Sequence, residues 1–167
     1  MPGGRMTVRE TRAEEFETVG QLVVSAYVGE GLVDADSGYV NELRDTAARS
    51  RDADLLVAVD EGQAQLLGTV TYCAGGSRYS EVAVPGEADF RMLAVDGAAR
   101  GRGVGETLVR ACLDRARAAG ASTMRLSTKE NMHAAHRLYE RLGFHRTPEL
   151  DWSPDADIKL LTYALDL

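Results

Sequence analysis

The chain has 167 residues, 44% of them hydrophobic and 27% charged, which is the composition of one ordinary globular domain with a core of its own. Its formal net charge of −7 argues against non-specific binding to nucleic acid and against binding to an acidic membrane surface. Two cysteines without a CxxC pattern, together with the lack of a long apolar run, favour a reducing, cytoplasmic location.

The N-terminal part of the chain predicts one strand followed by two helices. We expect a single domain over residues 1–167, in which the glycine-rich residues 1–5 form a frayed leader. Residues 6–11 predict a short strand. Apolar residues recur at three- and four-residue spacing over 11–28 and predict a helix, and 36–50 predict a second, more polar one.

The central part of the chain predicts three strands. Residues 54–60 and 65–74 are rich in β-formers and are separated by EGQA, so they predict a hairpin. Residues 75–86 predict a loop because glycine and serine recur there. Residues 87–95 predict the third strand.

The C-terminal part alternates helices and strands. A helix is predicted over 106–120, where Gly120 is a natural stop, and a strand over 122–128. Residues 131–144 predict another helix with Asn131 as its N-cap, and 158–167 predict a closing strand.

This element order is neither a clean alternation of strands and helices nor two separate blocks. We therefore predict an α/β fold with a mixed, mostly antiparallel twisted sheet and helices on both faces. The strand-loop-helix-strand unit over residues 87–128 is long enough for a right-handed parallel crossover. Ligands of such units collect at the carboxyl end of the strand and the amino end of the helix.

The stretch ARGRGVGETL, residues 99–108, places three glycines and two arginines at the head of the predicted helix. Each interior glycine destabilises a helix by about 1 kcal/mol relative to alanine, so exposed backbone matters more here than helix stability. Backbone N–H groups and the helix dipole attract anions at such an end. We expect a phosphate site, although tight turns and helix caps also recruit glycine.

Two other phosphate-binding motifs fit this stretch poorly. A P-loop needs a lysine followed by serine or threonine after its glycines, and the chain has no lysine between Glu61 and Lys129. The dinucleotide fingerprint GxGxxG would place Glu106 where its third glycine should pack against a strand.

The run DFRMLAVDGAARGRGVGETL, residues 89–108, resembles the central motif of the GCN5-related N-acetyltransferases, whose pyrophosphate loop reads [QR]-x-x-G-x-[GA]. A second block, AAHRLYERLGF over residues 134–144, is similar to the helix of that family that ends in LYxxLGF. Two blocks in the same order are much more specific than either alone. The resemblance extends over the whole chain in element order, and the residue-level match covers residues 87–145.

The resemblance implies that the ligand is acetyl-CoA, a cosubstrate, and that no metal is needed. The backbone of Leu93, Ala94 and Val95 would pair with the pantetheine arm, with the Leu93 N–H near the acetyl carbonyl. An amide aimed at that oxygen would stabilise the charge developing on it. The pyrophosphate would be held by backbone N–H groups of Arg100, Gly101, Arg102, Gly103, Val104, Gly105 and Glu106.

Acetyl transfer to an amine needs a general acid and a general base, because most primary amines are protonated at pH 7 and the leaving thiolate must be neutralised. Tyr139 occupies the general-acid position of the family, and the alternative is an aromatic at the edge of the core. Asp89 lies four residues before Leu93, where several family members carry a glutamate base, and Glu87 is a substitute. Each carboxylate could instead orient substrate or support the structure, and a water chain could lead to either.

We therefore predict an N-acetyltransferase in which a primary amine attacks acetyl-CoA directly. Acidic residues in 29–38, around 81–89 and in 151–157 favour a small cationic amine, followed by a protein amine. The alternatives are a non-enzymatic acyl-CoA sensor and O-acetylation of a hydroxyl group.

The three histidines are predicted to be surface residues rather than metal ligands, because no cysteine accompanies them; they are His133, His136 and His145. Homodimers are common in the family that the chain resembles.

Overall fold

A computed structural model describes residues 4–167, so residues 1–3 of the expected leader lie outside it. At Arg5, the carbonyl accepts a hydrogen bond of 3.0 Å from the Glu61 N–H. The chain divides into two compact units. Unit 1 comprises the described residues up to Tyr72 together with Met92–Cys112, and unit 2 comprises Cys73–Arg91 and Leu113–Leu167.

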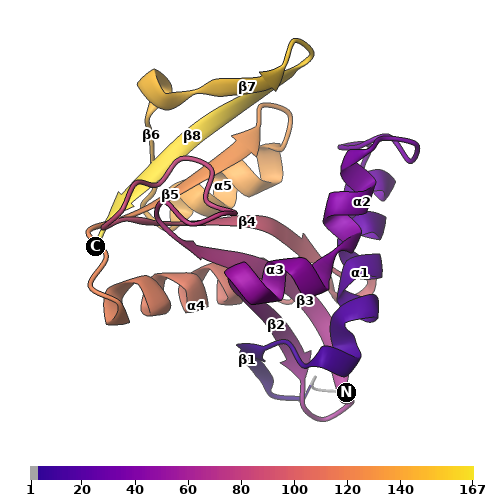
Figure 1. Ribbon diagram of the computed structural model, residues 1–167. Helices are drawn as coiled ribbons and strands as arrows, with labels where there is room; N and C mark the ends of the chain where they lie inside the picture. The colour runs from indigo at the N-terminus through magenta and orange to yellow at the C-terminus, as the bar shows by residue number, and fades with distance from the viewer. Residues whose placement is uncertain (1–3) are drawn as a thin grey trace. The chain divides into compact units, whose positions relative to one another are not determined.

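The elements follow the predicted order closely (Figure 1). In chain order they are β1 (Met6–Glu10), α1 (Phe16–Gly29), α2 (Tyr39–Arg44), α3 (Thr46–Asp52), β2 (Asp54–Asp60), β3 (Gln65–Ala74), β4 (Ala88–Val95), α4 (Val104–Ala118), β5 (Thr123–Lys129), α5 (His133–Arg141), β6 (His145–Arg146), β7 (Trp152–Asp155) and β8 (Ile158–Asp166). Short 3₁₀ turns occupy Ala13–Glu15, Gly97–Ala99 and Pro148–Leu150.

Unit 1 is a sheet with helices on both faces. Strand β2 pairs antiparallel with β1 and with β3, and the register sets Ala58 opposite Gly68. Val19 of α1 packs in one cluster with Leu55, Val57 and Val59 of β2. Successive side chains of a strand point to opposite faces, so Ala58 and Gly68 face away from α1, and Gly68 lies against α4.

Unit 2 is built around β5. Three residues at the start of β4, Ala88–Phe90, pair parallel with Met124–Leu126, and the other side of β5 pairs antiparallel with β8. Strands β6 and β7 both pair antiparallel with β8. Among residues 4–167, every strand pair described is antiparallel except β4–β5, so the predicted fold class is confirmed.

Two local predictions are wrong. The single helix expected over 36–50 is two helices, because Asp45 breaks the chain with a ψ of 69° and its side chain accepts the Ala48 N–H at 3.1 Å as the N-cap of α3. The N-cap of α5 is Met132 rather than Asn131. No strand was predicted at the positions of β6 and β7.

Within residues 4–167, no helix is both long enough and apolar enough to cross a bilayer.

Candidate active site

The loop between β4 and α4, in unit 1, contains the glycines that the sequence singled out. Gly101 and Gly103 have φ angles of +81° and +77°, a region that side-chain-bearing residues rarely adopt. Both are exposed, and a Cβ at either position would meet open space. The glycines are therefore required by backbone conformation and leave the amides of the loop accessible.

Helix α4 begins at Val104, directly after this loop, and runs for 15 residues. The first N–H groups of a helix have no partner within the helix, and they carry about half a positive charge. Val104 is 2% exposed and anchors the first turn in the core, whereas Gly105 and Glu106 are half-buried. The head of α4 is a fixed cradle of amide donors suited to an anion.

Strand β3 supports the cradle at a point of close approach. A Cβ at Gly68 would lie 2.8 Å from the Ala94 carbonyl oxygen and 2.9 Å from Cγ1 of Val104. Only glycine lets the end of β4 and the start of α4 approach β3 this closely. The Asp96 N–H also donates to the Leu67 carbonyl at 2.8 Å.

Both arginines of the loop are paired with carboxylates. The Arg102 guanidinium donates to the buried Asp60 at 3.0 Å, and that of Arg100 pairs with the exposed Glu30. Each positive charge of the loop therefore already has a negative partner.

Strand β4 is irregular next to the residues that were predicted to pair with the pantetheine arm. Met92 has a φ of +57°, which interrupts the regular alternation of side chains between Asp89 and Leu93. Beyond it, Ala94 is buried with Val23 and Leu43, while Leu93 and Val95 are half-buried. Asp89 and Leu93 therefore do not share one regular strand face.

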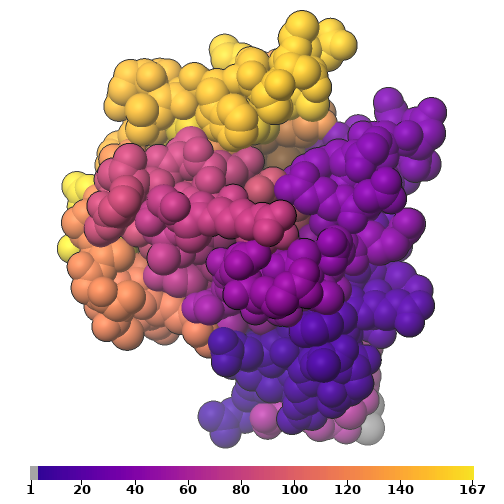
Figure 2. Space-filling view, in the orientation of Figure 1, coloured from indigo at the N-terminus to yellow at the C-terminus, as the bar shows by residue number. Residues whose placement is uncertain are grey.

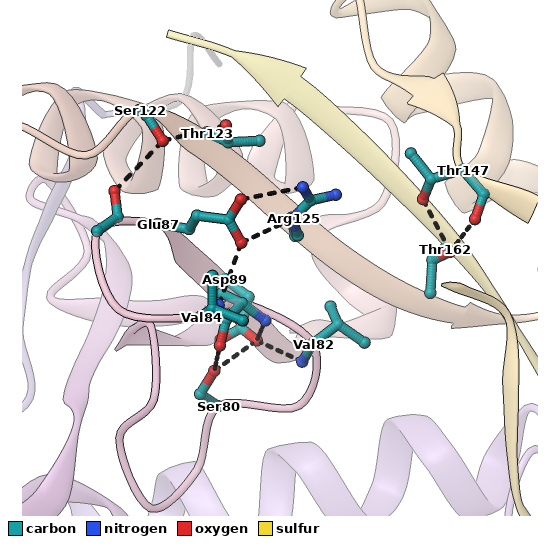
Figure 3. Close-up of polar contacts among 12 residues, drawn as sticks. Ser80, Val82, Val84, Glu87, Asp89, Ser122, Thr123, Arg125, Thr147 and Thr162 are labelled. Carbon is teal, nitrogen blue, oxygen red and sulfur yellow. Dashed lines mark hydrogen bonds and ion pairs between the residues drawn. The ribbon is translucent and has the colours of Figure 1, made fainter. Parts of the chain in front are cut away.

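Asp89, in unit 2, is 2% exposed and organises the loop before it. Its Oδ2 accepts four hydrogen bonds, from the Ser80 hydroxyl at 3.0 Å and from the N–H groups of Glu81, Val82 and Ala83 at 2.8, 3.0 and 3.2 Å (Figure 3). Successive amides that converge on one oxygen form an anion nest. Here the protein's own carboxylate fills the nest.

Glu87 closes the same loop against β5. Its two carboxylate oxygens accept from Nε and Nη2 of Arg125 at 2.8 and 2.9 Å, as the paired dashed lines of Figure 3 show. One oxygen also accepts the Val84 N–H at 3.1 Å. The hydrogen bond from Arg125 is the largest cause that lowers the pKa of Glu87 below its ordinary value, which makes it a weak proton acceptor.

Tyr139 is the buried residue of α5, at 4% exposure. Its ring lies 5.9 Å from Phe90, 5.9 Å from Phe144 and 6.1 Å from Tyr163, measured between centroids. Edge and tilted contacts of this kind fix the ring in one orientation. Burial, and a hydrogen bond of 2.9 Å from its hydroxyl to Glu140, raise the pKa of Tyr163 to about 12.

The glycine loop before α4 and Tyr139 on α5 both lie within the part of the chain that a known protein family matches. A profile described as the Acetyltransferase (GNAT) family matches residues 17–144. The chain belongs to the GNAT acetyltransferase family. As a member of that family, it is an acetyltransferase.

Solved GNAT structures share the fold. A GNAT-family acetyltransferase from Staphylococcus aureus Mu50 has a TM-score of 0.75 at 14% identity, covering 97% of this chain and 99% of its own. The putative acetyltransferase yncA from Salmonella typhimurium, solved with its cofactor acetyl-CoA, has 0.68 at 20%, covering 98% and 94%. PaiA N-acetyltransferase from Thermoplasma acidophilum, solved with coenzyme A, has 0.73 at 15%, covering 95% and 98%. No protein of curated function matches the sequence significantly.

The predicted site residues of this GNAT chain fall into two groups. Leu93, Ala94, Val95 and the loop residues 100–106 come together in unit 1, at the end of β4 and the head of α4. Glu87, Asp89 and Tyr139 belong to unit 2. Exposed amides, left-handed glycines and a helix N-terminus fit the pyrophosphate of acetyl-CoA.

Sequence reasoning missed three functional features. The Asp60 partner of Arg102 and the Arg125 partner of Glu87 come from distant strands, and no local pattern marks such pairs. The amides of residues 81–83 are backbone groups, so no side-chain pattern in the sequence indicates them.

No group of three His, Cys, Asp or Glu side chains suited to a metal occurs between residues 4 and 167.

Proposed function

We propose that this acetyltransferase transfers the acetyl group of acetyl-CoA to a primary amine by direct attack, as a single catalytic domain over residues 1–167. The observation that carries the proposal is the open glycine cradle at the head of α4, in a chain of the GNAT family. When bound, acetyl-CoA supplies the reactive thioester.

The amides of residues 100–106 hold the pyrophosphate in this proposal. The left-handed glycines Gly101 and Gly103 turn the backbone, and the first turn of α4 adds the donors of Val104, Gly105 and Glu106. The backbone of Leu93, Ala94 and Val95 orients the pantetheine arm. The Leu93 N–H stabilises negative charge on the acetyl oxygen, an effect whose loss from other enzymes costs about 3 kcal/mol.

Tyr139 acts as the general acid and gives its phenolic proton to the coenzyme A sulfur. The packing of its ring against Phe90, Phe144 and Tyr163 supports this role, because an acid must keep one orientation to act at a fixed atom. The hydroxyl of Tyr163 already donates to Glu140 at 2.9 Å.

Asp89 and Glu87 position residues 75–87 rather than accept the proton of the amine. Asp89 already accepts four hydrogen bonds on one oxygen, and Glu87 is held by Arg125 with a lowered pKa. The lowered pKa makes Glu87 a poor proton acceptor at pH 7, and the hydrogen bonds of Asp89 commit its carboxylate to the loop. We therefore assign deprotonation of the amine to water.

Direct attack needs no nucleophile from the protein. Cys73 and Cys112 are both fully buried. A thiol in that position cannot receive an acetyl group without movement of the core.

A small cationic amine is the proposed acceptor. Several of the acidic residues that suggested it are neutralised internally, since Glu81 pairs with Arg91 and Asp151 with Arg146. Asp34 and Asp36 are exposed, on the segment between α1 and α2 that lies at the molecular surface in purple (Figure 2). That segment is the strongest candidate for attracting a cation.

The test of this function is the Tyr139→Phe variant, with Tyr163→Phe as the matched control. Loss of a general acid lowers kcat by about 10²-fold and leaves the KM for acetyl-CoA unchanged. Tyr163→Phe removes a hydroxyl from the same aromatic cluster and should retain kcat within a few fold. Equal activity of the two variants would contradict the role of Tyr139.

A further inference from the structure

Asp60 is the most completely buried carboxylate that the proposed mechanism does not use. Its side chain has no exposed surface, although it stands at the end of β2, beside a hairpin turn. Burying a charge without partners is strongly unfavourable, so the contacts of Asp60 indicate what it stabilises.

The two oxygens of Asp60 make different contacts. Oδ1 accepts the N–H groups of Gly62 and Gln63 at 3.0 and 3.2 Å, which closes the turn between β2 and β3. Oδ2 accepts from Nη2 of Arg102 at 3.0 Å. Gly4 packs against Oδ1 and the Gly62 backbone, where a Cβ would collide with both.

Asp60 therefore connects the rigid β2–β3 hairpin to the middle of the glycine loop. Gly101 and Gly103, on either side of Arg102, both have left-handed φ angles and open surroundings. Without a fixed point between them, two such glycines would leave the loop free to change conformation. The ion pair provides that point, and 33% of the Arg102 side chain remains exposed.

We propose that Asp60 is a positioning residue for acetyl-CoA: it pins Arg102, and through it the loop, in the conformation that receives the pyrophosphate. The proposal rests on the proposed binding of acetyl-CoA at residues 100–106. In this proposal, one edge of the Arg102 guanidinium binds Asp60 and the other edge binds phosphate. A planar guanidinium with five N–H donors can make both contacts at once.

The other loop arginine provides a contrast. Arg100 pairs with Glu30, but both side chains are largely exposed, at 60% and 46%. Exposed ion pairs contribute little, because water and salt screen them. We therefore assign positioning to Asp60–Arg102 and not to Glu30–Arg100.

The experiment is Asp60→Asn, measured by acetyl-CoA titration calorimetry and by steady-state kinetics. Asparagine keeps the oxygen that closes the turn and removes only the charge and the acceptor for Arg102. We expect the Kd and KM for acetyl-CoA to rise roughly tenfold, with kcat within about twofold of wild type. A general loss of structure would lower kcat as well.

Glu15→Gln is the matched control. Glu15 is another carboxylate of unit 1, with 18% of its side chain exposed, and it is bound bidentately to Arg9 at 2.8 and 2.9 Å, away from the loop. It should lose stability without losing affinity for acetyl-CoA. Equal losses of affinity in Asp60→Asn and Glu15→Gln, or unchanged affinity in Asp60→Asn, would overturn the proposal.

Arg102→Lys keeps the proposal testable if Asp60→Asn does not fold. Lysine retains the positive charge, but its ammonium group lacks the planar geometry that lets a guanidinium bind Asp60 and a phosphate at the same time. The Kd for acetyl-CoA should therefore rise severalfold. Unchanged affinity in Arg102→Lys would overturn the positioning role. If Gly103→Ala weakens binding while the Asp60 and Arg102 variants do not, the pyrophosphate site stands and the inference fails; if none weakens binding, the site itself is misassigned.

Discussion

Replacing Asp89 tests whether its carboxylate holds the loop before β4 or accepts a proton during catalysis. In Asp89→Asn, one amide oxygen can still face the donors of residues 80–83, while the NH₂ group takes the place of Oδ1, which is buried and has no hydrogen-bond partner among residues 4–167. Loss of the charge and one misplaced donor should lower the free energy of unfolding by about 1–2 kcal/mol. Because chemistry does not depend on this carboxylate in our account, kcat should fall less than about tenfold.

Asp89→Ala is the stronger perturbation. It removes the acceptor of four hydrogen bonds, and each buried donor left without a partner costs about 1–3 kcal/mol. Water can reach some of the half-buried loop, so we expect a total loss of about 3–5 kcal/mol. Total stabilities are commonly about 5–15 kcal/mol, so this variant should be marginal.

Urea unfolding measures the stability of both variants, and limited trypsinolysis measures the order of the loop. Arg78 is exposed on that loop and should become a preferred cleavage site in Asp89→Ala. The refuting result is an Asp89→Asn protein with wild-type stability and wild-type protection at Arg78 whose kcat is lower by about 10²- to 10⁴-fold. Those are the values expected for loss of a general base.

Three further predictions concern other parts of the chain. The hydrogen bond from Arg146 lowers the pKa of Asp151 from 3.8 to about 2, so ionised Asp151 stabilises the fold by about 1–2 kcal/mol, allowing for solvent screening. This stabilisation is present above pH 4 and is lost as the pH falls towards 2. Asp151→Asn should remove this part of the acid dependence of the melting temperature, and an unchanged pH profile in the variant would contradict the assignment. Gly68→Ala should lower the free energy of unfolding by about 1–3 kcal/mol in chemical denaturation, because its Cβ would lie 2.8 Å from the Ala94 carbonyl oxygen, and wild-type stability would show that the strand and helix can move apart. Gly103→Ala should weaken acetyl-CoA binding in calorimetry, since φ of +77° is strained by about 1–2 kcal/mol for alanine, and unchanged affinity would argue against this loop as the pyrophosphate site.

The order of elements could be predicted because it depends on local pattern. Residues 54–60 and 65–74 form the two strands of the predicted hairpin with the predicted bounds. The break at Asp45 carried a signal that the periodicity of its neighbours concealed: an aspartate followed by threonine and two alanines is a common helix start.

The contacts of the site could not be predicted because they join residues far apart in sequence. Asp60 and Arg102 are 42 positions apart, and Glu87 and Arg125 are 38 apart. The left-handed φ at Met92 is equally hidden, since methionine shows no preference for that conformation. The position of the glycine loop could therefore be predicted from the sequence, whereas the contacts that support it could not.

The central claim is acetyl transfer from acetyl-CoA to a primary amine, and release of free coenzyme A thiol tests it most directly. The purified protein is mixed with acetyl-CoA and, separately, with polyamines, amino sugars, amino acids and peptides, with Tyr139→Phe beside each reaction. The account predicts thiol release that depends on a small cationic amine and is about 10²-fold slower in the variant. Release that needs only a hydroxyl acceptor, or tight acetyl-CoA binding with no release for any acceptor, would contradict it.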